Sequence, residues 1–394
     1  MAKLKVGVLF GGRSGEHEVS LLSAASVIEA LDTEKYEVVP IGITREGRWL
    51  TAAHAENLLK GKEHSPEARP LRAGDPEATA TAAVLANGEA IIVPPVPGRD
   101  LVPFQSALPH RRLEDRALEV DIIFPVLHGT FGEDGTVQGL LELAGLAYVG
   151  AGVLGSAAGM DKDVMKRLFR EAGLPIVKHV VVLRQEWETA PRKVRRRIES
   201  ALHYPVFVKP ANLGSSVGIT KVHDGDELPA GLNEAAAYDR KIVVEQSVGG
   251  KSGKARELEC AVLGNDNPDA SVVGEVVPVK EFYDYTAKYL DAGSELIIPA
   301  KLTKSQTRRV QELAIGAFQA VDCAGLGRVD FLMDPRSERI YVNEINTLPG
   351  FTSISMYPKL WAASGVAYPE LIDRLLQLGL ERHAERLRNR YTRQ

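Results

Sequence analysis

Two short segments towards the carboxyl end of the chain carry polar side chains two residues apart. Arg328 and Asp330 lie in the sequence GRVDF, and Glu344 and Asn346 lie in the sequence VNEINT. If these segments are β-strands, residues two apart point to the same face of the sheet. Carboxylate and amide oxygens are the ligands that Mg²⁺ takes in sites where it also holds phosphate groups. The spacing therefore predicts a magnesium site, with two ordinary half-exposed strands as the alternative.

A lysine and a glycine-rich loop supply the second chemical feature. Lys209 ends an apolar, strand-like run and is followed by residues 213–218, whose sequence is LGSSVG. Backbone N–H groups of such a loop can approach phosphate oxygens, and a lysine at the strand end adds positive charge. An ordinary hairpin turn would look the same when taken alone. Together with the two acidic segments, the loop indicates a site for the phosphate groups of a substrate and their magnesium.

Two other short motifs fail when their surroundings are considered. The sequence GKS at residues 250–252 resembles the end of a phosphate-binding P-loop, but that motif requires a glycine where Glu245 stands. We therefore interpret GGKSGK as a surface turn. The sequence GSSVG at residues 214–218 matches the nucleophile elbow of hydrolases, which requires a helix directly after the serine. The residues that follow, ITKV, are typical of a strand, so a hydrolase is disfavoured.

The composition is that of a globular chain with several domains. Its 394 residues are 44% hydrophobic and 25% charged, and this length predicts two or three domains. A formal net charge of −4 gives no basic field for nucleic acid, and the arginine-rich residues 192–199 are interpreted as a solvated helix face. Cys260 and Cys323 are expected to be buried apolar residues. No apolar run approaches the ~18 residues of a membrane span, and no signal peptide is recognised. We expect a cytoplasmic protein without nucleic-acid or membrane partners.

The elements expected at the amino terminus indicate an α/β protein. Residues 5–10 are typical of a strand that stops at Gly11-Gly12, a helix is expected from about residue 16 to 31, and residues 37–43 form the next strand. Strand, glycine turn, helix and strand in this order predict an open parallel sheet. Residues 51–118 are rich in Ala, Pro, Glu and Arg and are interpreted as an elaboration of this first domain.

At these residues the chain resembles the D-alanine–D-alanine ligases, a family of the ATP-grasp superfamily. The resemblance extends from Lys5 to about Tyr368, apart from residues 51–118 and the GGKSGK insert. The segments that carry it are GGRSGEHEVSL, PVLHGTFGEDGTVQG, GMDKDVMK, VKPANLGSSVGI, the acidic and hydrophobic stretch ending at Glu257, EFYDYTAKYL, GLGRVDF and NEINTLPGFTSISM.

The resemblance implies an α/β fold in which an open parallel-sheet domain precedes a two-subdomain ATP-grasp unit. The expected boundaries are residues 1–149 for the amino-terminal domain, 150–244 for the central α+β subdomain, and 245–394 for the carboxyl-terminal subdomain with the metal site and a lid loop. ATP would lie between the two subdomains.

The resemblance also implies which residues hold the nucleotide and its metal ions. Two lysines would bind the phosphates, and the serine loop would close over them. One glutamate and a nearby backbone group would contact adenine, and a second glutamate would bind the ribose hydroxyls. In that order these residues are Lys162, Lys209, Ser216, Glu245, Val248 and Glu257. The metal ligands would be Asp330, Glu344 and Asn346, binding two Mg²⁺ ions that Mn²⁺ can replace; activation by a monovalent cation is left open.

Further residues are implied for the chemistry. Glu16 would pair with the ammonium of the first amino acid near His128, although from the residues alone Glu16 could equally be a first-turn acid favoured by the helix dipole. Arg328 and the N–H of Gly350 would stabilise the tetrahedral oxyanion. Ser215 and Tyr289 would form hydrogen bonds with Glu16 and so connect the three domains. The carboxylate of the second substrate would be held by Lys288, Ser355 and the backbone of Met356.

The expected reaction is the ATP-dependent joining of two D-alanines through an acyl phosphate, for peptidoglycan precursor synthesis. A ligase that makes D-alanyl-D-lactate or D-alanyl-D-serine is the alternative within the fold, although the lid sequence YDYTAKY matches the dipeptide type. A silent ATP-binding regulator is the alternative from another class, and it would require lost metal or phosphate ligands. The resemblance further implies a homodimer.

Overall fold

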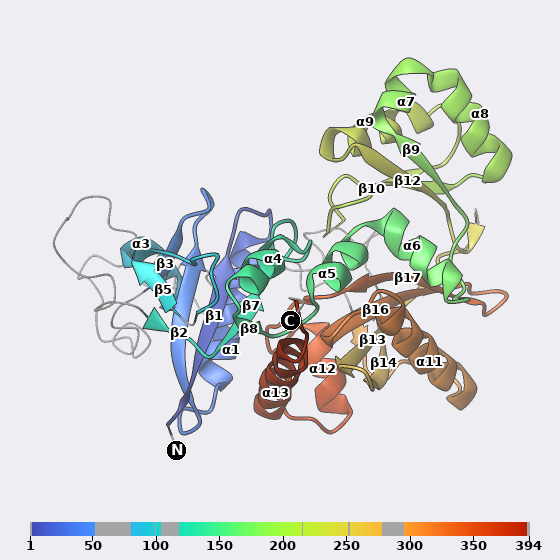
Figure 1. Ribbon diagram of the computed structural model, residues 1–394. Helices are drawn as coiled ribbons and strands as arrows, with labels where there is room; N and C mark the ends of the chain where they lie inside the picture. The colour runs from blue at the N-terminus through green and yellow to red at the C-terminus, as the bar shows by residue number, and fades with distance from the viewer. Residues whose placement is uncertain are drawn as a thin grey trace, which may run out of the picture.

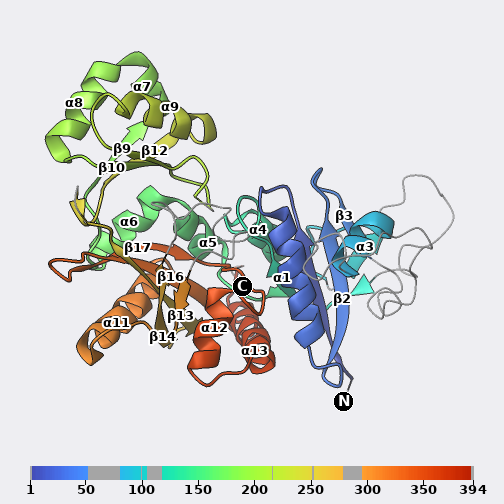
Figure 2. The ribbon, with the colours of Figure 1, turned by 180° about the vertical axis from the view of Figure 1, so that it is seen from behind.

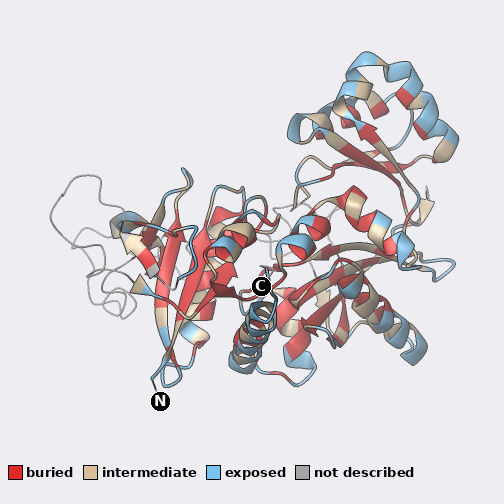
Figure 3. Ribbon diagram, in the orientation of Figure 1, coloured by how far each residue is buried: buried red, intermediate tan, exposed pale blue. Residues whose placement is uncertain are grey.

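The computed structural model describes residues 2–51, 80–98, 100–103, 118–214, 216–250, 253–277 and 295–391. The described residues form three sheets, which follow one another along the chain (Figure 1). The amino-terminal sheet lies to one side, and the other two lie one above the other beside it, as the reverse view also shows (Figure 2). In each unit the strands are mainly buried and the outer helix faces exposed (Figure 3).

The amino-terminal sheet has a parallel half and an antiparallel half. Its order is β6-β5-β4-β3-β2-β1-β7-β8, in which β2, β1, β7 and β8 are parallel neighbours and β3 to β6 pair antiparallel. The strands are β1 (Leu4–Gly11), β2 (Tyr36–Ile43), β3 (Trp49–Thr51), β4 (Glu89–Ile92), β5 (Asp100–Pro103), β6 (Leu118–Glu119), β7 (Ile122–Val126) and β8 (Ala147–Tyr148). The expected parallel sheet is thus confirmed, and the described part of the predicted elaboration extends its edge with antiparallel strands.

Strand β1 is buried on both faces because helices cover both sides of the parallel half. Val6 and Val8 pack with helix α1 (His17–Ala30) and α13 (Tyr368–Leu387), whereas Leu9 packs on the opposite face with α4 (Thr136–Leu143). This explains why its sequence is a continuous apolar run rather than an alternating one. The strand ends at Gly11, whose φ of 89° favours glycine and where a Cβ would lie 2.3 Å from the Ile43 carbonyl oxygen. Helix α3 (Ala80–Asn87) lies beside α1.

One face of the central sheet is covered by helices. Its antiparallel order is β11-β10-β12-β9, and three helices pack against it. These elements are β9 (His179–Leu183), α7 (Arg184–Thr189), α8 (Pro191–Ala201), β10 (Val206–Pro210), β11 (Thr220–Val222), α9 (Leu228–Tyr238) and β12 (Lys241–Gln246). Helix α8 buries Val194 and Ile198 while Lys193 and Arg196 are exposed, so the arginine-rich run is a solvated helix face as predicted.

The carboxyl-terminal sheet is antiparallel, in the order β15-β14-β13-β16-β17. Its elements are β13 (Arg256–Gly264), β14 (Asp269–Val277), β15 (Glu295–Ile297), α11 (Lys304–Ala320), β16 (Gly325–Met333), β17 (Ile340–Asn346) and α12 (Met356–Ala363). Helices α5 (Val153–Met160) and α6 (Lys162–Glu171) precede the central sheet in sequence but pack into this carboxyl-terminal core through Ala158, Met165 and Phe169. Both cysteines are buried here as free thiols, as predicted.

Helix α13 joins the carboxyl-terminal unit to the amino-terminal sheet. The Arg382 guanidinium lies 4.1 Å from the centre of the Tyr148 ring and donates to the Tyr148 carbonyl oxygen at 3.2 Å. Tyr148 in turn donates to Glu142 at 2.6 Å. These contacts fix the amino-terminal domain against the unit that carries the acidic segments. Within the described ranges, no helix is both long enough and apolar enough to span a membrane.

Candidate active site

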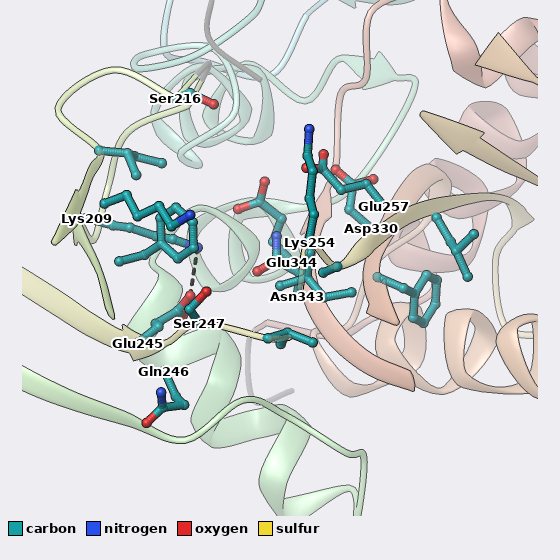
Figure 4. Close-up of a pocket in the computed structure, with 18 of the residues that line it drawn as sticks. Lys209, Ser216, Glu245, Gln246, Ser247, Lys254, Glu257, Asp330, Asn343 and Glu344 are labelled. Atoms are coloured by element: carbon teal, nitrogen blue, oxygen red, sulfur yellow. Dashed lines mark ion pairs between the residues drawn. The ribbon is translucent and has the colours of Figure 1, made fainter. Parts of the chain in front are cut away.

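A cleft lies between the uncovered face of the central sheet and the carboxyl-terminal sheet (Figure 4). Lys209 and Glu245 lie on one side of it, and Glu257 and Asp330 lie on the other. The predicted site residues that line it are Lys209, Ser216, Glu245, Val248, Glu257, Asp330 and Glu344. Residues from both α+β units, more than 130 positions apart in some pairs, are therefore brought together as the resemblance implies.

The side of the cleft formed by the central sheet and α6 carries the lysines, and we call it the basic wall. Val208 and Val244 point into the helix-covered core, so Lys209 and Glu245, each one residue further along its strand, point into the cleft. Lys209 Nζ lies 2.7 Å from Glu245 Oε2. Burial disfavours the Lys209 ammonium, but Glu245 and Glu344 outweigh burial and raise the pKa of Lys209. The lysine therefore stays charged although it is only 8% exposed.

A second lysine of the basic wall stands at the start of α6. Asp161 caps this helix by accepting from the N–H groups of Asp163 and Val164, at 3.1 and 3.0 Å. The cap places Lys162 so that its Nζ donates to the Leu213 carbonyl oxygen at 2.7 Å and lies 3.8 Å from Glu344 Oε2. Burial lowers the pKa of Lys162, and Glu344 opposes this effect. Lys162 thus connects the start of the serine loop with the opposite side of the cleft.

Lys166, one turn further along α6, was not predicted as a site residue. It is 1% exposed, and its Nζ lies 2.9 Å from Glu245 Oε1. Burial alone would raise the pKa of Glu245, but the charges of Lys166 and Lys209 lower it far below its ordinary range. Glu245 is therefore an ionised carboxylate between two ammonium groups. Lys166 stands in the segment GMDKDVMK that carried the resemblance, and its burial is the signal that the sequence could not give.

The opposite side of the cleft carries carboxylates, and we call it the acidic wall. The two predicted segments are the neighbouring strands β16 and β17, in which Asp330 pairs with Glu344 and Arg328 with Asn346. The pairing confirms that each pair of side chains shares a face and places the two faces side by side. Asp330, Glu344 and Asn346 are half-buried, so each of these side chains keeps part of its surface in contact with solvent.

Arg328 is bound within the acidic wall. It donates to both oxygens of Asp330, at 2.7 and 2.8 Å, and its Nε lies 2.9 Å from Glu259 Oε2. Glu259, on β13, was not predicted as a site residue although it lines the cleft. A fork-shaped guanidinium between two carboxylates is rigidly oriented, which suits a group that must meet an oxyanion.

The donor set fits a hard divalent cation that shares its ligands with phosphate. In the described part of the chain no group of three His, Cys, Asp or Glu residues could by itself hold a metal ion. The predicted set instead has two carboxylates and the Asn346 amide, whose Oδ1 also accepts from the Leu348 N–H at 3.1 Å. Mg²⁺ is usually bound by one or two carboxylates, with substrate phosphates and waters completing its shell. The residues present therefore fit the implied metal.

The amino-terminal domain brings Glu16 to this region. Glu16 is 8% exposed and precedes α1, and its N–H donates to Ser14 Oγ at 3.2 Å while Ser14 donates to the His128 carbonyl oxygen at 2.6 Å. Gly129 has a φ of 77°, which favours glycine, and a Cβ there would lie 2.8 Å from Glu16 Oε2. The loop after β7 is thereby held against the start of α1.

His128 links the two domains behind Glu16. Its Nδ1 lies 3.1 Å from the Leu348 carbonyl oxygen and its Nε2 lies 3.2 Å from Ser23 Oγ. Burial lowers its pKa, with Glu16 and the Leu348 carbonyl acting in the opposite direction. A neutral, hydrogen-bonded imidazole at this point is well suited to orienting the loop that follows β17.

Glu133 is a further acid that the sequence reasoning missed. Its Oε1 accepts from the Gly129 N–H at 2.8 Å. Burial and the nearby charge of Glu16 raise its pKa to about 8, while the Gly129 bond, Arg328 and Lys162 act in the opposite direction. Glu133 thus lies within electrostatic reach of both walls and of Glu16. Its position in the quoted segment HGTFGEDG was the available signal.

Gly350, Ser355 and Met356 follow β17 and lie at the amino end of α12. A Cβ on Gly350 would lie 3.2 Å from Ser355 Oγ, and Ser355 Oγ lies 2.7 Å from Thr352 Oγ1. Met356 is the first residue of α12. The free N–H groups at a helix amino terminus attract a carboxylate, which agrees with the expectation for Ser355 and Met356. Ser215, Lys288 and Tyr289, with the rest of the predicted lid, lie outside the described residues.

The sequence and the fold were compared with known proteins. Residues 5–151 match the family model described as the D-ala D-ala ligase N-terminus, and residues 168–377 match the D-ala D-ala ligase C-terminus. The D-alanine–D-alanine ligase of Bacillus cytotoxicus is 48% identical, with both chains covered completely.

Two solved structures resemble the chain over nearly its whole length. The D-alanine–D-alanine ligase of Coxiella burnetii has 36% identity and a TM-score of 0.78, over 98% of this chain and 97% of that one. The VanG D-Ala:D-Ser ligase of Enterococcus faecalis has 35% identity and a TM-score of 0.78, over 96% of this chain and 100% of that one. With both family models matched in order and full-length relatives at this identity, the chain belongs to the D-alanine–D-alanine ligase family.

Proposed function

We propose that the protein joins two molecules of D-alanine into D-alanyl-D-alanine, with cleavage of ATP to ADP and phosphate. The observation that carries the proposal is the cleft between the two sheets, whose basic wall holds buried lysines and whose acidic wall holds the half-buried Asp330 and Glu344, with Asn346 further along the same strand as Glu344. A triphosphate needs cations on one side and, through its metal, carboxylates on the other. Both sides are present, and Glu16 lies at one end of the arrangement.

The first step activates the carboxylate of one D-alanine. Its oxygen forms a bond to the γ-phosphorus of ATP, the bond from that phosphorus to the bridging oxygen breaks, and ADP leaves. Two anions repel each other, so the ammonium groups of Lys162 and Lys209 neutralise phosphate charge. Asp330, Glu344 and Asn346 would hold Mg²⁺, or Mn²⁺ in its place, and such ions lower the remaining repulsion when bound. Glu16 binds the ammonium of this first amino acid.

The second step forms the peptide bond. The deprotonated amine of the second D-alanine attacks the acyl carbon, and the tetrahedral oxyanion formed is stabilised by Arg328 and the N–H of Gly350. One such donor contributes about 3–4 kcal/mol in comparable sites. The nitrogen loses a proton, and collapse of the intermediate breaks the carbon–oxygen bond to the phosphoryl group and releases phosphate, which takes up that proton. Ser355 and the amino end of α12 hold the carboxylate of this second amino acid.

A second candidate is a D-alanine–D-serine ligase, because the VanG D-Ala:D-Ser ligase is as similar in fold as the D-alanine–D-alanine ligase of Coxiella burnetii. The dipeptide reaction is favoured by the full-length relatives, which are named D-alanine–D-alanine ligases, and by the lid sequence YDYTAKY. We extend the proposal to a cytoplasmic homodimer that supplies peptidoglycan precursors. A silent regulator is disfavoured because the phosphate and metal residues in the described ranges are all present.

The test is product analysis with competing acceptors. Purified protein is incubated with ATP, Mg²⁺ and D-alanine, with or without D-serine or D-lactate, and phosphate release is measured beside chromatographic separation of the products. We expect D-alanyl-D-alanine to form in equal amount to phosphate and to dominate the mixtures. Dominance of D-alanyl-D-serine would assign the second candidate, and absence of phosphate release would contradict both.

A further inference from the structure

Lys166 is a fully buried cation to which the proposed reaction gives no role. Its Nζ lies 2.9 Å from Glu245 Oε1 on β12 and donates to the Asn343 carbonyl oxygen on β17 at 2.9 Å. One ammonium group on α6 therefore connects the central sheet with the carboxyl-terminal sheet. A buried charge is costly unless it is paired and hydrogen-bonded, so this arrangement is maintained by its two partners together.

Glu245 is the only anion within ion-pairing distance that the structure gives to Lys166 in its described part, and it is shared with Lys209. Lys209 points into the cleft and is proposed to contact phosphate. When phosphate is bound, the positive charge of Lys209 is divided between phosphate and Glu245. Lys166 then remains as the fixed counter-ion that keeps Glu245 ionised, because it is enclosed by protein and does not itself line the cleft.

Glu245 is 2% exposed but lines the cleft, so a ligand that fills the cleft can meet its carboxylate. A carboxylate has about four acceptor positions, of which Lys166 and Lys209 occupy two. Glu245 lines the cleft, beside the backbone of Gln246, Ser247 and Val248 (Figure 4). An ionised carboxylate can only accept hydrogen bonds, so it attracts the amino group of a 6-aminopurine and repels the carbonyl oxygen of a 6-oxopurine.

We propose that Lys166 is a positioning residue that sets the base preference of the nucleotide site, by keeping the Glu245 carboxylate ionised and oriented to accept from a 6-aminopurine. The proposal rests on the nucleotide site of the proposed function and adds a residue that touches neither nucleotide nor metal. Without the cation, Glu245 can take up a proton and donate to a 6-oxo group. The discrimination between the two bases would then fall.

The experiment compares ATP with inosine triphosphate, which carries a 6-oxo group, in Lys166→Met and in a matched control. Lys241→Met removes another ammonium, on a half-buried side chain, that joins β12 to the start of α6 through Asp161 at 2.7 Å and Asp163 at 3.4 Å, without an ion pair to Glu245. Dissociation constants are measured by calorimetry, and KM values for nucleotide and D-alanine are measured by phosphate release. Melting temperatures report folding.

We expect Lys166→Met to raise the dissociation constant of ATP at least tenfold and that of inosine triphosphate much less. The preference for ATP should then fall by a similar factor. The KM for D-alanine should stay within about twofold. Lys241→Met should lower the melting temperature and keep the preference. In a Glu245→Gln background, Lys166→Met should no longer change the preference, because the carboxylate through which Lys166 acts is absent.

The proposal is overturned if folded Lys166→Met keeps the preference for ATP over inosine triphosphate. This includes the case in which the substitution weakens the binding of both nucleotides equally. If Lys166→Met does not fold, Lys166→Gln replaces it, since glutamine can still donate to the Asn343 carbonyl oxygen but carries no charge, and the same criteria apply. Failure of the proposed function is distinguishable, because it would remove D-alanine-dependent phosphate release from the unmodified protein while nucleotide binding remains measurable.

Discussion

The two walls of the cleft differ in how deeply their charged side chains are buried. The cations of the basic wall are buried, with Lys162, Lys166 and Lys209 at 7%, 1% and 8% exposure, and the last two share the carboxylate of Glu245. The predicted metal-binding carboxylates of the acidic wall, Asp330 and Glu344, are half-buried and remain partly solvated. Buried charges need a permanent partner, whereas an ion such as Mg²⁺ needs ligands that water can reach before it binds.

As a consequence, side chains of the protein itself pair with the groups that are expected to bind phosphate and metal. Glu245 stands beside Lys209 where phosphate charge is expected, and Arg328 stands beside Asp330 near the expected metal. Binding exchanges these contacts for contacts with ATP and its metal ions. The difference between the walls predicts which substitutions stop the reaction, which weaken the binding of ATP, and which change only the stability of the fold.

The largest effect is expected from Glu344→Gln on the acidic wall. Loss of one anionic ligand should remove about 4 kcal/mol of transition-state stabilisation, or roughly a thousandfold in rate. The melting curve should change little, because Glu344 is half-buried and lies 3.8 Å from Lys162. Phosphate release at saturating Mg²⁺ is the measurement, and near-normal turnover would refute the metal assignment.

The next effect is expected from Lys209→Ala on the basic wall. It should raise the KM for ATP by about 10- to 100-fold, because a charge-assisted contact to phosphate is lost, while the KM for D-alanine stays nearly constant. Stability should fall by about 1–3 kcal/mol, since buried Glu245 loses one of its partners. If the constants for D-alanine move instead, Lys209 faces a different ligand from the one inferred.

A third test compares two glutamates, the buried Glu245, which forms ion pairs with Lys166 and Lys209, and the half-buried Glu133, for which the described residues show no ion pair. The pKa of Glu133 rises from 4.5 to about 8, so between these values the folded protein binds a proton that the unfolded chain releases. Its contribution to stability is therefore greatest at low pH and is lost as pH rises through that window. Glu133→Gln should flatten the fall in melting temperature between about pH 5 and 8.

The matched control for this titration is Glu171→Gln at the exposed end of α6. It should leave the pH dependence of the melting temperature as it is in the unmodified protein. Equal slopes in the unmodified protein and Glu133→Gln would show that Glu133 is already ionised in the folded state.

The smallest effect is expected from a basic residue outside the cleft. Arg196 is exposed on α8, whereas the buried residues of that helix pack against the central sheet. Arg196→Ala should change stability by less than about 0.5 kcal/mol and leave the KM for ATP unchanged. A clear rise in that KM would mean that charge on the central unit acts on the nucleotide over a distance, rather than through the basic wall.

The sequence alone determined the local chemistry of this protein. The spacing of Arg328 with Asp330 and of Glu344 with Asn346 predicted side chains on shared strand faces, because the period of a strand is two. The apolar run before Gly11 and the helix after it predicted the opening of the parallel sheet. Such features depend on neighbours in the chain, so they could be inferred without knowing which segments meet.

Only the tertiary structure decided which groups face each other and how deeply they are buried. The pairing of Asp330 with Glu344 depends on the register of β16 against β17, and Lys166 reaches Asn343 across 177 positions of the chain. The opposite pKa shifts of Glu133 and Glu245 likewise come from burial and from charges on distant elements. Side-chain spacing gives the direction in which a residue points, whereas its partner and its exposure are set by long-range packing.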